Sequence, residues 1–376
     1  ATIAILSTMV LVTLSGGANI YAGGDYMQKA MFPHDFSIQG KGVTGEQMEQ
    51  ALTEFVNEQQ LPVTKKGVYP YYTMGVTSRA DNQLDINAAA QKFVTPKTYI
   101  LAISEADYQS MTGKSLDLGD DEVALYQQGV KLDSKQDLQL AGQTFKIKEE
   151  LKEDFIFGHL PDQMNMIVPE KIYMVLKNPD QIFSAMTDKY AVNLNYYGWL
   201  DTKLSTEEQR NLRDAYQEKL QQFNQTLPEN QAVYGSVTAF DKQEIKGMLG
   251  GMFFIGIFLS IVFMLGTILI IYYKQISEGY EDRDRFVILQ KVGLDEKQIR
   301  QTIRKQILIV FFLPLAFAFI HLTFAYHMLS LILSALGVLN SALMLAVTLG
   351  VCAIFFISYV IVFMITSRSY RKIVSM

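Results

Sequence analysis

The sequence predicts a membrane protein with four transmembrane α-helices and an α+β extracellular domain inserted between the first and second of them. The first observation is a lack of charge. Residues 1–22 and 247–273 contain no Asp, Glu, Lys or Arg, and neither does the 61-residue stretch 307–367. A helix needs about 20 apolar residues to cross the hydrocarbon core of a bilayer. The second observation is the polar segment 25–243, which is long enough to build a hydrophobic core of its own.

The longest uncharged stretch must contain two spans, because a single helix of 61 residues would be about 90 Å long. Gly337 and the pair Asn340-Ser341 offer a break between them. The four predicted spans are 1–24, 244–273, 307–333 and 341–366. A signal peptide is the weaker interpretation of the first stretch, since neither a basic segment nor a clear cleavage site accompanies it. Because the chain begins inside a hydrophobic run without Met, we expect further sequence upstream.

The basic residues predict the orientation of the spans. The connector 274–306 contains eight Lys and Arg residues and the tail 367–376 contains three, whereas the turn 334–340 contains none. Basic residues near the ends of spans remain on the cytoplasmic side. We therefore expect a multi-pass protein of the cell membrane, with the connector and the tail cytoplasmic and residues 25–243 extracellular.

Local patterns predict mixed secondary structure in the extracellular domain. Thr44 and Gln47 form a capping box at the start of a helix over 44–60, and Ser205 and Glu208 form another at the start of a helix over 205–223. Two shorter helices are expected at 104–111 and 179–189. The expected strands, rich in aromatic and β-branched residues, are 36–39, 69–76, 93–103, 123–126, 145–147, 166–176, 191–199 and 233–239.

The composition limits the functions that the chain can perform. Residues 25–243 contain 31 acidic and 21 basic residues, a net charge of −10. Solubility is the simpler explanation, and attraction of cationic ligands is the alternative. Cys352 is the single cysteine, so no disulfide can form within the chain. The triplet 113–115 resembles the end of a phosphate-binding loop, but Tyr108 stands where its first glycine is required.

No set of residues in the sequence indicates catalysis or metal binding. The four histidines are His34, His159, His321 and His327. The last two are six residues apart on a predicted helix, so they do not share a face. We therefore expect no enzymatic activity, no cofactor and no metal in this chain, and we expect His321 to hydrogen-bond a neighbouring span.

Small residues predict a close crossing of the first two spans. Gly247 and Gly251 have the spacing that lets two helices approach each other, and Gly16 and Gly17 lie at a similar depth on the first span. One interpretation is that motion passes between the membrane and the outer domain there. Ordinary packing without motion is the equally weighted alternative.

Two aromatic clusters have two possible roles. Tyr71 and Tyr72 belong to one cluster, and Tyr197 and Trp199 belong to the other. They would suit a groove for a peptide or a lipid head group. Such residues more often fill a core, and the core interpretation is favoured.

The connector is predicted to contain a short helix from about Arg283 to Val292, ended by Gly293. Phe286 to Leu289 are four consecutive apolar residues, which cover most of the circumference of a helix. Such a helix suits two neighbours, the membrane and a soluble partner protein. A membrane-surface helix without a partner is the alternative. The residues expected to dock the partner are Arg283, Arg285, Phe286, Ile288, Leu289, Val292 and Gly293.

The connector and the spans resemble a known family. ILQKVGLDEKQI resembles the connector of FtsX-like permeases, the membrane subunits of type VII ABC transporters. The strings YYKQISEGYEDRDRFVILQKVG, IRKQILIVFFLPLAFAFIH and TSRSYRKIV are similar to a narrower group, the Bce-type permeases of Gram-positive bacteria. ATIAILSTMVLVTLS and GMFFIGIFLSIVFMLGTILIIYYKQISEG fit the same group. The resemblance covers all four spans and is weaker in the outer domain.

The resemblance implies a specific cellular role. Permeases of this group have ten spans with the large outer domain between spans seven and eight, so this chain would be the last four spans with that domain. They pair with a cytoplasmic ATPase dimer, which binds ATP and magnesium, and residues 286–292 would be the helix that docks on it. They work with a membrane histidine kinase.

The implied ligand is a cationic antimicrobial peptide such as bacitracin or a lantibiotic, or its complex with a lipid-linked cell wall precursor. No nucleic acid is expected among the partners. Two alternatives with the same architecture remain: an FtsX-like regulator of cell wall hydrolases, and an extractor of lipids or lipoproteins.

Overall fold

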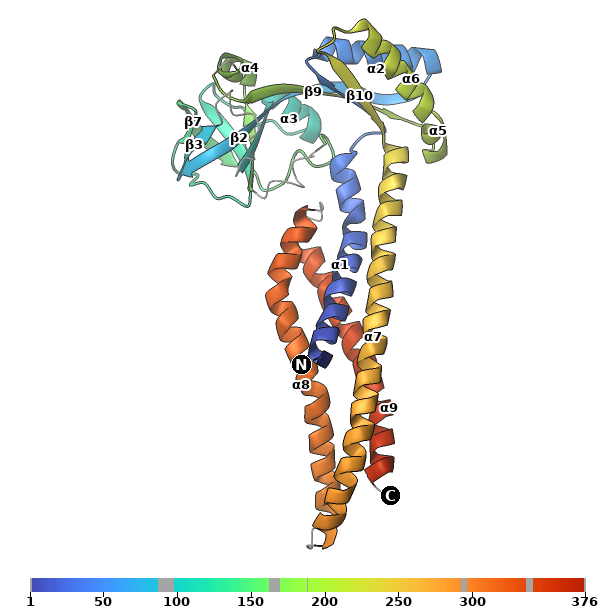
Figure 1. Ribbon diagram of the computed structural model, residues 1–376. Coiled ribbons are helices and arrows are strands. Elements are labelled where there is room, and N and C mark those ends of the chain that lie inside the picture. Colours follow the sequence, from blue (N-terminus) through green and yellow to red (C-terminus); the bar gives the residue numbers. More distant parts are fainter. Residues whose placement is uncertain are drawn as a thin grey trace. The chain divides into compact units, whose positions relative to one another are not determined.

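The computed structural model describes residues 2–86, 98–161, 170–187, 189–291, 296–335 and 341–374. Within them, four helices are long and apolar enough to cross a membrane, as predicted. They are α1 (Thr2–Met31), α7 (Thr238–Lys291), α8 (Glu296–Ala335) and α9 (Ser341–Val374) (Figure 1). The chain forms two compact units: a helical unit of residues 1–24 and 247–376, and an inserted unit of residues 25–246. This confirms four candidate spans with a mixed α/β domain inserted after the first.

The second predicted span ends at Lys274, one residue from the expected end, but its helix does not end there. The helix was expected to stop at residue 273 and to be followed by a separate helix from about Arg283. Instead, α7 continues without interruption from Thr238 to Lys291. The segment between these points contains no proline, and its one glycine, Gly279, costs only about 1 kcal/mol in a helix interior. Nothing in the local sequence therefore ends the helix before Lys291.

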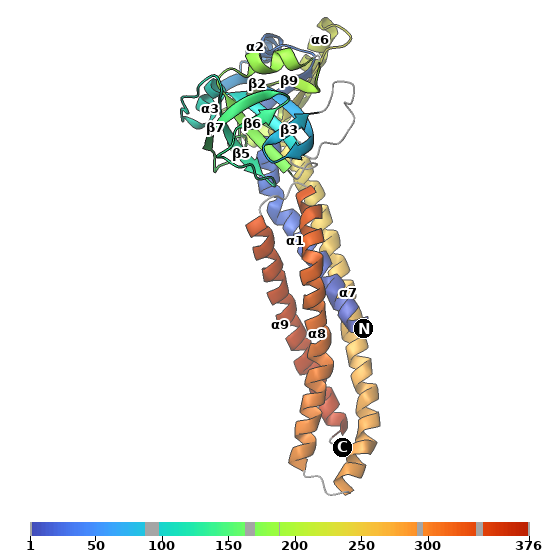
Figure 2. The ribbon, with the colours of Figure 1, turned by 90° about the vertical axis from the view of Figure 1, so that its left-hand side faces the viewer.

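The inserted unit is built on a ten-stranded sheet with the order β10-β1-β9-β2-β3-β6-β7-β5-β8-β4, in which β4 also pairs with β2. The pairing of β4 with β2 closes seven strands into a barrel, part of which faces the viewer in Figure 2. The barrel strands are β2 (Val63–Ala80), β3 (Gln83–Ile86), β4 (Thr98–Ser104), β5 (Glu122–Gln128), β6 (Leu138–Leu140), β7 (Gln143–Glu150) and β8 (Glu170–Leu176). Closure leaves these strands without a free edge between them.

Three strands extend this sheet beyond β2. They are β9 (Val192–Thr202), β1 (Phe36–Lys41) and β10 (Ala232–Val237), each antiparallel to its neighbour. Two helices cover one face of this extension, α2 (Gly45–Gln59) and α6 (Arg213–Thr226), which lie together over β9 and β10 in Figure 1. Phe36, Phe55 and Tyr216 meet between the helices and the strands, with ring centroids 4.7–5.6 Å apart. Met48, Leu52 and Phe55 of α2 are buried in this core.

Two further cores fill and surround the barrel. Strand residues of alternate positions, such as Tyr72, Met74 and Val76 of β2, point into the barrel interior. The opposite face of the same strands packs against α3 (Glu105–Thr112) and the segment 151–160. The long strand β2 therefore contributes to both cores and to the extension.

Most element predictions are confirmed, with specific exceptions. Both capping boxes are present. The helix predicted over 205–223 is divided at Leu212 into α5 (Thr206–Asn211) and α6. The helix predicted over 179–189 is α4 (Pro179–Phe183), followed by a 3-10 turn, Ser184–Met186. The short strands β3 and β6 were not predicted, because four and three residues are too few for a clear alternation. The predicted segments 93–97 and 166–169 lie outside the described residues.

Candidate functional site

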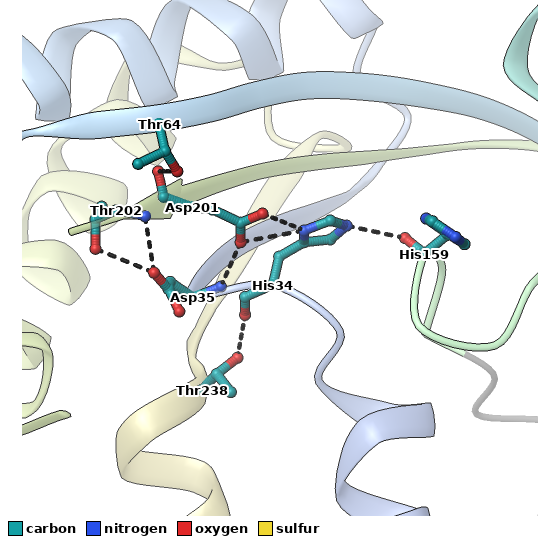
Figure 3. Close-up of polar contacts among 7 residues, drawn as sticks. All are labelled: His34, Asp35, Thr64, His159, Asp201, Thr202 and Thr238. Carbon is teal, nitrogen blue, oxygen red and sulfur yellow. Dashed lines mark hydrogen bonds and ion pairs between the residues drawn. The ribbon is translucent and has the colours of Figure 1, made fainter. Parts of the chain in front are cut away.

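A polar cluster holds the two ends of the inserted unit to its sheet. His34 and Asp35 follow α1, and Asp201 and Thr202 end β9 (Figure 3). The Nδ1 atom of His34 lies 3.1 and 3.2 Å from the two carboxylate oxygens of Asp201. The backbone amide of Asp35 donates to the same carboxylate at 3.1 Å. The chain is therefore attached to β9 directly after it leaves α1.

The start of α7 joins the same cluster. The amide and the hydroxyl of Thr202 donate to the Asp35 carboxylate at 2.8 and 3.1 Å. The amide of Thr238 donates to the carbonyl of Asp35 at 2.9 Å, and its hydroxyl donates to the carbonyl of His34. We call these five residues, His34, Asp35, Asp201, Thr202 and Thr238, the His34 cluster. It ties the segment after α1, the last residues of β9 and the first residue of α7 to one another.

His34 is buried, and its ring contacts Trp199, Asp201 and the backbone of His159. Its ring stacks on Trp199 with centroids 3.8 Å apart and an interplanar angle of 16°. Its Nε2 atom lies 3.2 Å from the carbonyl oxygen of His159. Burial by itself would raise the pKa of the Asp201 carboxyl, but the hydrogen bonds from His34 and from the Asp35 amide outweigh burial and lower that pKa. Asp201 is therefore ionised at neutral pH.

The contacts of this cluster join three segments of the inserted unit. Its polar groups are bonded to one another, and the described residues contain no group of three His, Cys, Asp or Glu side chains that could hold a metal ion. The sequence analysis named His34 among the four histidines without a role for it, and missed the cluster. His34 and Asp201 are 167 residues apart, and no local pattern marks such a pair. The one local signal was Pro33, which ends α1 directly before His34.

The aromatic residues proposed for a ligand groove lie in the hydrophobic cores. Tyr72, Tyr197 and Trp199 are only 2%, 1% and 7% exposed. Tyr72 points into the barrel, where its hydroxyl donates to Asp180 at 2.8 Å, whereas Tyr71 packs against the core on the opposite face. Adjacent strand residues point to opposite faces, so Tyr71 and Tyr72 cannot line one groove. The groove interpretation is therefore wrong for these buried side chains, and the core interpretation is correct.

The close crossing of α1 and α7 uses other glycines than those predicted on α7. A Cβ added to Gly247 or Gly251 would meet nothing within 4 Å. A Cβ added to Gly256 would lie 2.9 Å from the carbonyl oxygen of Thr13 and 3.4 Å from the Cα of Gly17. The crossing thus lies at Gly17 and Gly256, further along α7 than the sequence analysis placed it. Gly16 faces a different helix, with Leu329 of α8 at 3.7 Å from its added Cβ.

Polar contacts join α1 to each of the other three long helices. Thr13 lies 2.8 Å from the hydroxyl of Ser260 on α7, and Thr8 lies 3.3 Å from the Nδ1 atom of His321 on α8. Asn19 donates to the hydroxyl of Thr348 on α9 at 3.0 Å. The contact of His321 with α1 is the hydrogen bond to a neighbouring span that the sequence predicts. Helix α1 is therefore the common neighbour of the other helices.

The residues predicted to dock an ATPase lie at the end of α7 and beyond it. Ile288 is 61% exposed on α7. Arg283, Arg285, Phe286 and Leu289 lie on the same helix, but their side chains are outside the described part of the structure. Val292 and Gly293 fall in residues 292–295, which are not described either. Their predicted role stays a prediction.

The chain is similar to parts of two permeases. It is 34% identical over 119 residues to the ABC transporter permease protein YxdM of Bacillus subtilis (strain 168), which covers 32% of this chain and 18% of YxdM. It is 30% identical over 132 residues to the uncharacterized ABC transporter permease YvcS of the same organism, which covers 35% of this chain and 19% of YvcS. The aligned residues thus span less than a fifth of the length of either curated relative. No protein-family model matches the chain.

Among solved structures, the chain is similar to a crystal structure of a Bacillus anthracis protein described as a lipoprotein. The match covers 54% of this chain and 96% of that protein, with a TM-score of 0.24 and 6% sequence identity. The two permeases above therefore carry the comparison: this is a multi-pass membrane protein with four candidate spans, similar over about a third of its length to ABC transporter permeases.

Proposed function

We propose that this chain is part of the permease subunit of an ABC transporter that protects a Gram-positive bacterium from peptides that attack its cell wall. The observation that carries the proposal is the combination of four apolar helices, one large domain inserted after the first of them, and partial identity to two Bacillus ABC permeases. The names of the relatives support the transporter class. The resemblance of the connector to Bce-type permeases supports the peptide as the substrate class.

A separate ATPase supplies the energy in this proposal. The triplet 113–115 lacks the first glycine of a phosphate-binding loop, because Tyr108 stands in that place, so ATP and magnesium are assigned to a partner ATPase dimer. The exposed side chain of Ile288 supports docking at the end of α7, because covering an exposed apolar side chain with a partner protein is favourable in water. The continuous α7 supports the transfer of movement from that end to Thr238, since a helix without a break is stiff along its axis.

The charge of the inserted unit supports a cationic ligand. Its excess of ten acidic over basic residues within 25–243 attracts a positively charged peptide, alone or bound to a lipid-linked precursor, and raises its local concentration. In this proposal a membrane histidine kinase receives the signal that the peptide is being removed. The attraction is screened by salt, so it should weaken at high ionic strength.

Deletion of the gene for the full-length protein tests the substrate class. The expected result is increased sensitivity to bacitracin or to a lantibiotic, restored by the wild-type gene. An antibiotic that acts on ribosomes is the control, and sensitivity to it should not change. Unchanged peptide sensitivity with altered cell shape would contradict the proposal and would favour a regulator of cell wall hydrolases.

Site-specific crosslinking tests the ATPase partner separately. The chain has one cysteine, so Cys352→Ser provides a background into which Ile288→Cys can be introduced alone. A thiol-reactive photocrosslinker at position 288 should capture a protein that binds ATP and is encoded beside the permease. Met248→Cys is the matched control, because Met248 is an exposed apolar residue near the opposite end of α7. Equal capture at positions 248 and 288 would contradict docking at the end of α7.

A further inference from the structure

The His34 ring faces a hydrogen-bond acceptor at each of its nitrogens. On one side the acceptor is the Asp201 carboxylate, and on the other it is the backbone carbonyl of His159 (Figure 3). A carbonyl oxygen can only accept, and an ionised carboxylate can only accept. A neutral imidazole carries a single N–H, whereas an imidazolium carries two. The geometry around His34 is therefore satisfied by the protonated ring.

An alternative placement of the proton would leave His34 neutral and put a proton on the Asp201 carboxyl. The surroundings of Asp201 oppose it. Its carboxylate also accepts the Asp35 amide, and the net effect of its environment lowers the pKa of this carboxyl below its ordinary value. The imidazolium is further stabilised by the face of Trp199, because a cation is attracted to the electron-rich face of an indole ring.

The other charged groups around the cluster do not replace the His34 imidazolium between Asp201 and the His159 carbonyl. Lys65 of β2 lies within electrostatic reach of both Asp201 and His159, and Lys242 of α7 lies within reach of Asp35. Tyr69 and Tyr197, which pack beside Trp199, have raised pKa values through burial, so they are neutral at physiological pH. Burial and the neighbouring His34 and Lys65 lower the pKa of the His159 imidazole. His34 thus bonds both the Asp201 carboxylate and the carbonyl of His159.

We propose that His34 is a pH-dependent latch: its imidazolium holds the segment 151–161 to β9 and to the residues after α1, and loss of one proton releases that segment. When the ring becomes neutral, its remaining N–H stays on Asp201, because a hydrogen bond to a carboxylate is stronger than one to a carbonyl. The lone pair of Nε2 then faces the carbonyl oxygen of His159 at 3.2 Å. Two acceptors at this distance repel each other, so the His159 end of the contact opens.

Release of this segment would change its contact with the last turns of α1. The ring of Phe157 in the segment stacks on Tyr26 of α1, with centroids 4.5 Å apart. Phe155, Ile156 and Leu160 of the same segment are buried in the core around the barrel. The core keeps the segment folded, and the His34 contact fixes how it meets α1. The inference does not depend on the substrate proposed above, because it concerns contacts within the inserted unit alone.

Trp199 is the only tryptophan in the chain and lies directly under the His34 ring, so it reports the protonation of that ring. An imidazolium in contact with an indole quenches its fluorescence, and neutral imidazole quenches it less. The 376-residue chain, purified in detergent, is titrated from about pH 5 to 8.5 while Trp199 emission is recorded. Emission should rise in one step, and the step should be absent in His34→Gln.

His159→Gln is the matched control, because the latch uses the backbone carbonyl of His159 and not its side chain. This variant should keep the step of the wild-type chain. Asp201→Asn should move the midpoint of the step to a pH lower by about one unit or more, because the opposite charge that favours the imidazolium is lost. This variant keeps the proposal testable if His34→Gln does not fold. A step that persists in His34→Gln, or disappears in His159→Gln, would overturn the proposal.

Hydrogen exchange of backbone amides tests the release itself. In the wild-type chain, the amides of His159 and Leu160 bond to the carbonyl of Ile156, so they are protected while the segment is held. After correction for the intrinsic dependence of exchange on pH, their protection should fall by about tenfold across the fluorescence step. Protection of β9 should not change. Constant protection of residues 159 and 160 across the step would show that His34 titrates without acting as a latch.

Discussion

The inserted unit and the helical unit differ in the contacts that stabilise each of them. In the inserted unit, large side chains such as Phe55, Tyr173 and Tyr216 are almost completely buried between strands and helices. In the helical unit, large apolar side chains such as Phe254 and Phe324 are exposed on the helix surfaces, at 67% and 81%. The contacts between its helices are made in part by small residues and by single polar pairs.

The difference follows from the solvent of each unit. In water, burial of apolar surface stabilises a fold by about 25 cal/mol per Å². In a bilayer, the lipid tails are as apolar as the side chains, so burial of a Leu or Phe between helices gains little. Close approach at Gly17 and Gly256, and the hydrogen bond between Asn19 and Thr348, then determine which helices meet. A matched pair of substitutions in the two units should therefore have unequal effects.

The largest expected difference is between two phenylalanines. Phe55→Ala should lower the free energy of unfolding of the inserted unit by about 3 to 5 kcal/mol, because it leaves a cavity between Phe36 and Tyr216. Phe254→Ala should change the stability of the helical unit by less than about 0.5 kcal/mol. Thermal unfolding followed by Trp199 fluorescence and by helix content measures the two effects. Equal losses at the two positions would contradict the comparison.

A smaller effect is expected at the crossing of α1 and α7. Gly256→Ala places a Cβ 2.9 Å from the backbone oxygen of Thr13, so the helices must separate, at a cost of about 1 to 3 kcal/mol. Gly251→Ala is the control, because its Cβ would meet nothing within 4 Å. Unfolding of the helical unit by a denaturing detergent measures the difference. If both variants unfold alike, the crossing contributes nothing to the stability of this unit.

The polar contact between α1 and α9 should contribute less. Asn19→Leu removes the hydrogen bond to Thr348 and should cost about 0.6 to 1.7 kcal/mol. Thr348→Val should cost a similar amount, and the double variant should cost less than the sum of the two single variants. Thr323→Val is the control, since the Thr323 hydroxyl bonds only within α8 among the described contacts. Additive effects of Asn19→Leu and Thr348→Val would show that the two side chains do not interact.

The smallest expected effect is a loss of folding stability at low pH, and it should be confined to the inserted unit. Burial alone would raise the pKa of the Glu105 carboxyl, but the amides of Leu116, Asp117 and Leu118 and the hydroxyl of Ser115 donate to it and lower that pKa. A carboxyl with a lowered folded pKa stabilises the fold above its unfolded pKa of about 4.5, and this stabilisation disappears as the pH falls through the folded pKa.

Glu105→Gln should therefore lower the unfolding temperature at pH 7, and the gap to the wild-type chain should close below about pH 4. The measurement is thermal unfolding at several pH values. Glu153→Gln is the control, since Glu153 is a highly exposed partner of Lys114 and should have little effect at any pH. A gap of constant size at all pH values would indicate that the shape of the Glu105 side chain matters rather than its charge.

Local features of the sequence determined the four spans, both capping boxes and the presence of a mixed domain after the first span. Each depends on residues that are close together in the chain: an uncharged run, or a Thr or Ser followed three residues later by Gln or Glu. The continuity of α7 was missed because the charged connector was predicted to contain a separate short helix from about Arg283. Nothing between 274 and 291 requires the helix to end, since Lys, Arg and Glu continue a helix as readily as most apolar residues.

Tertiary structure alone decided the rest. The pairing of β4 with β2 that closes the barrel, the choice of Gly256 rather than Gly247 for the crossing, and the meeting of His34 with Asp201 all join residues distant in the sequence. Side-chain type and spacing along the chain specify what a residue can bond, but not which distant residue the fold brings to it. His34 meets Asp201 because β1, which begins at Phe36, pairs with β9 with Phe36 opposite Leu200, and that register is fixed by packing of the unit.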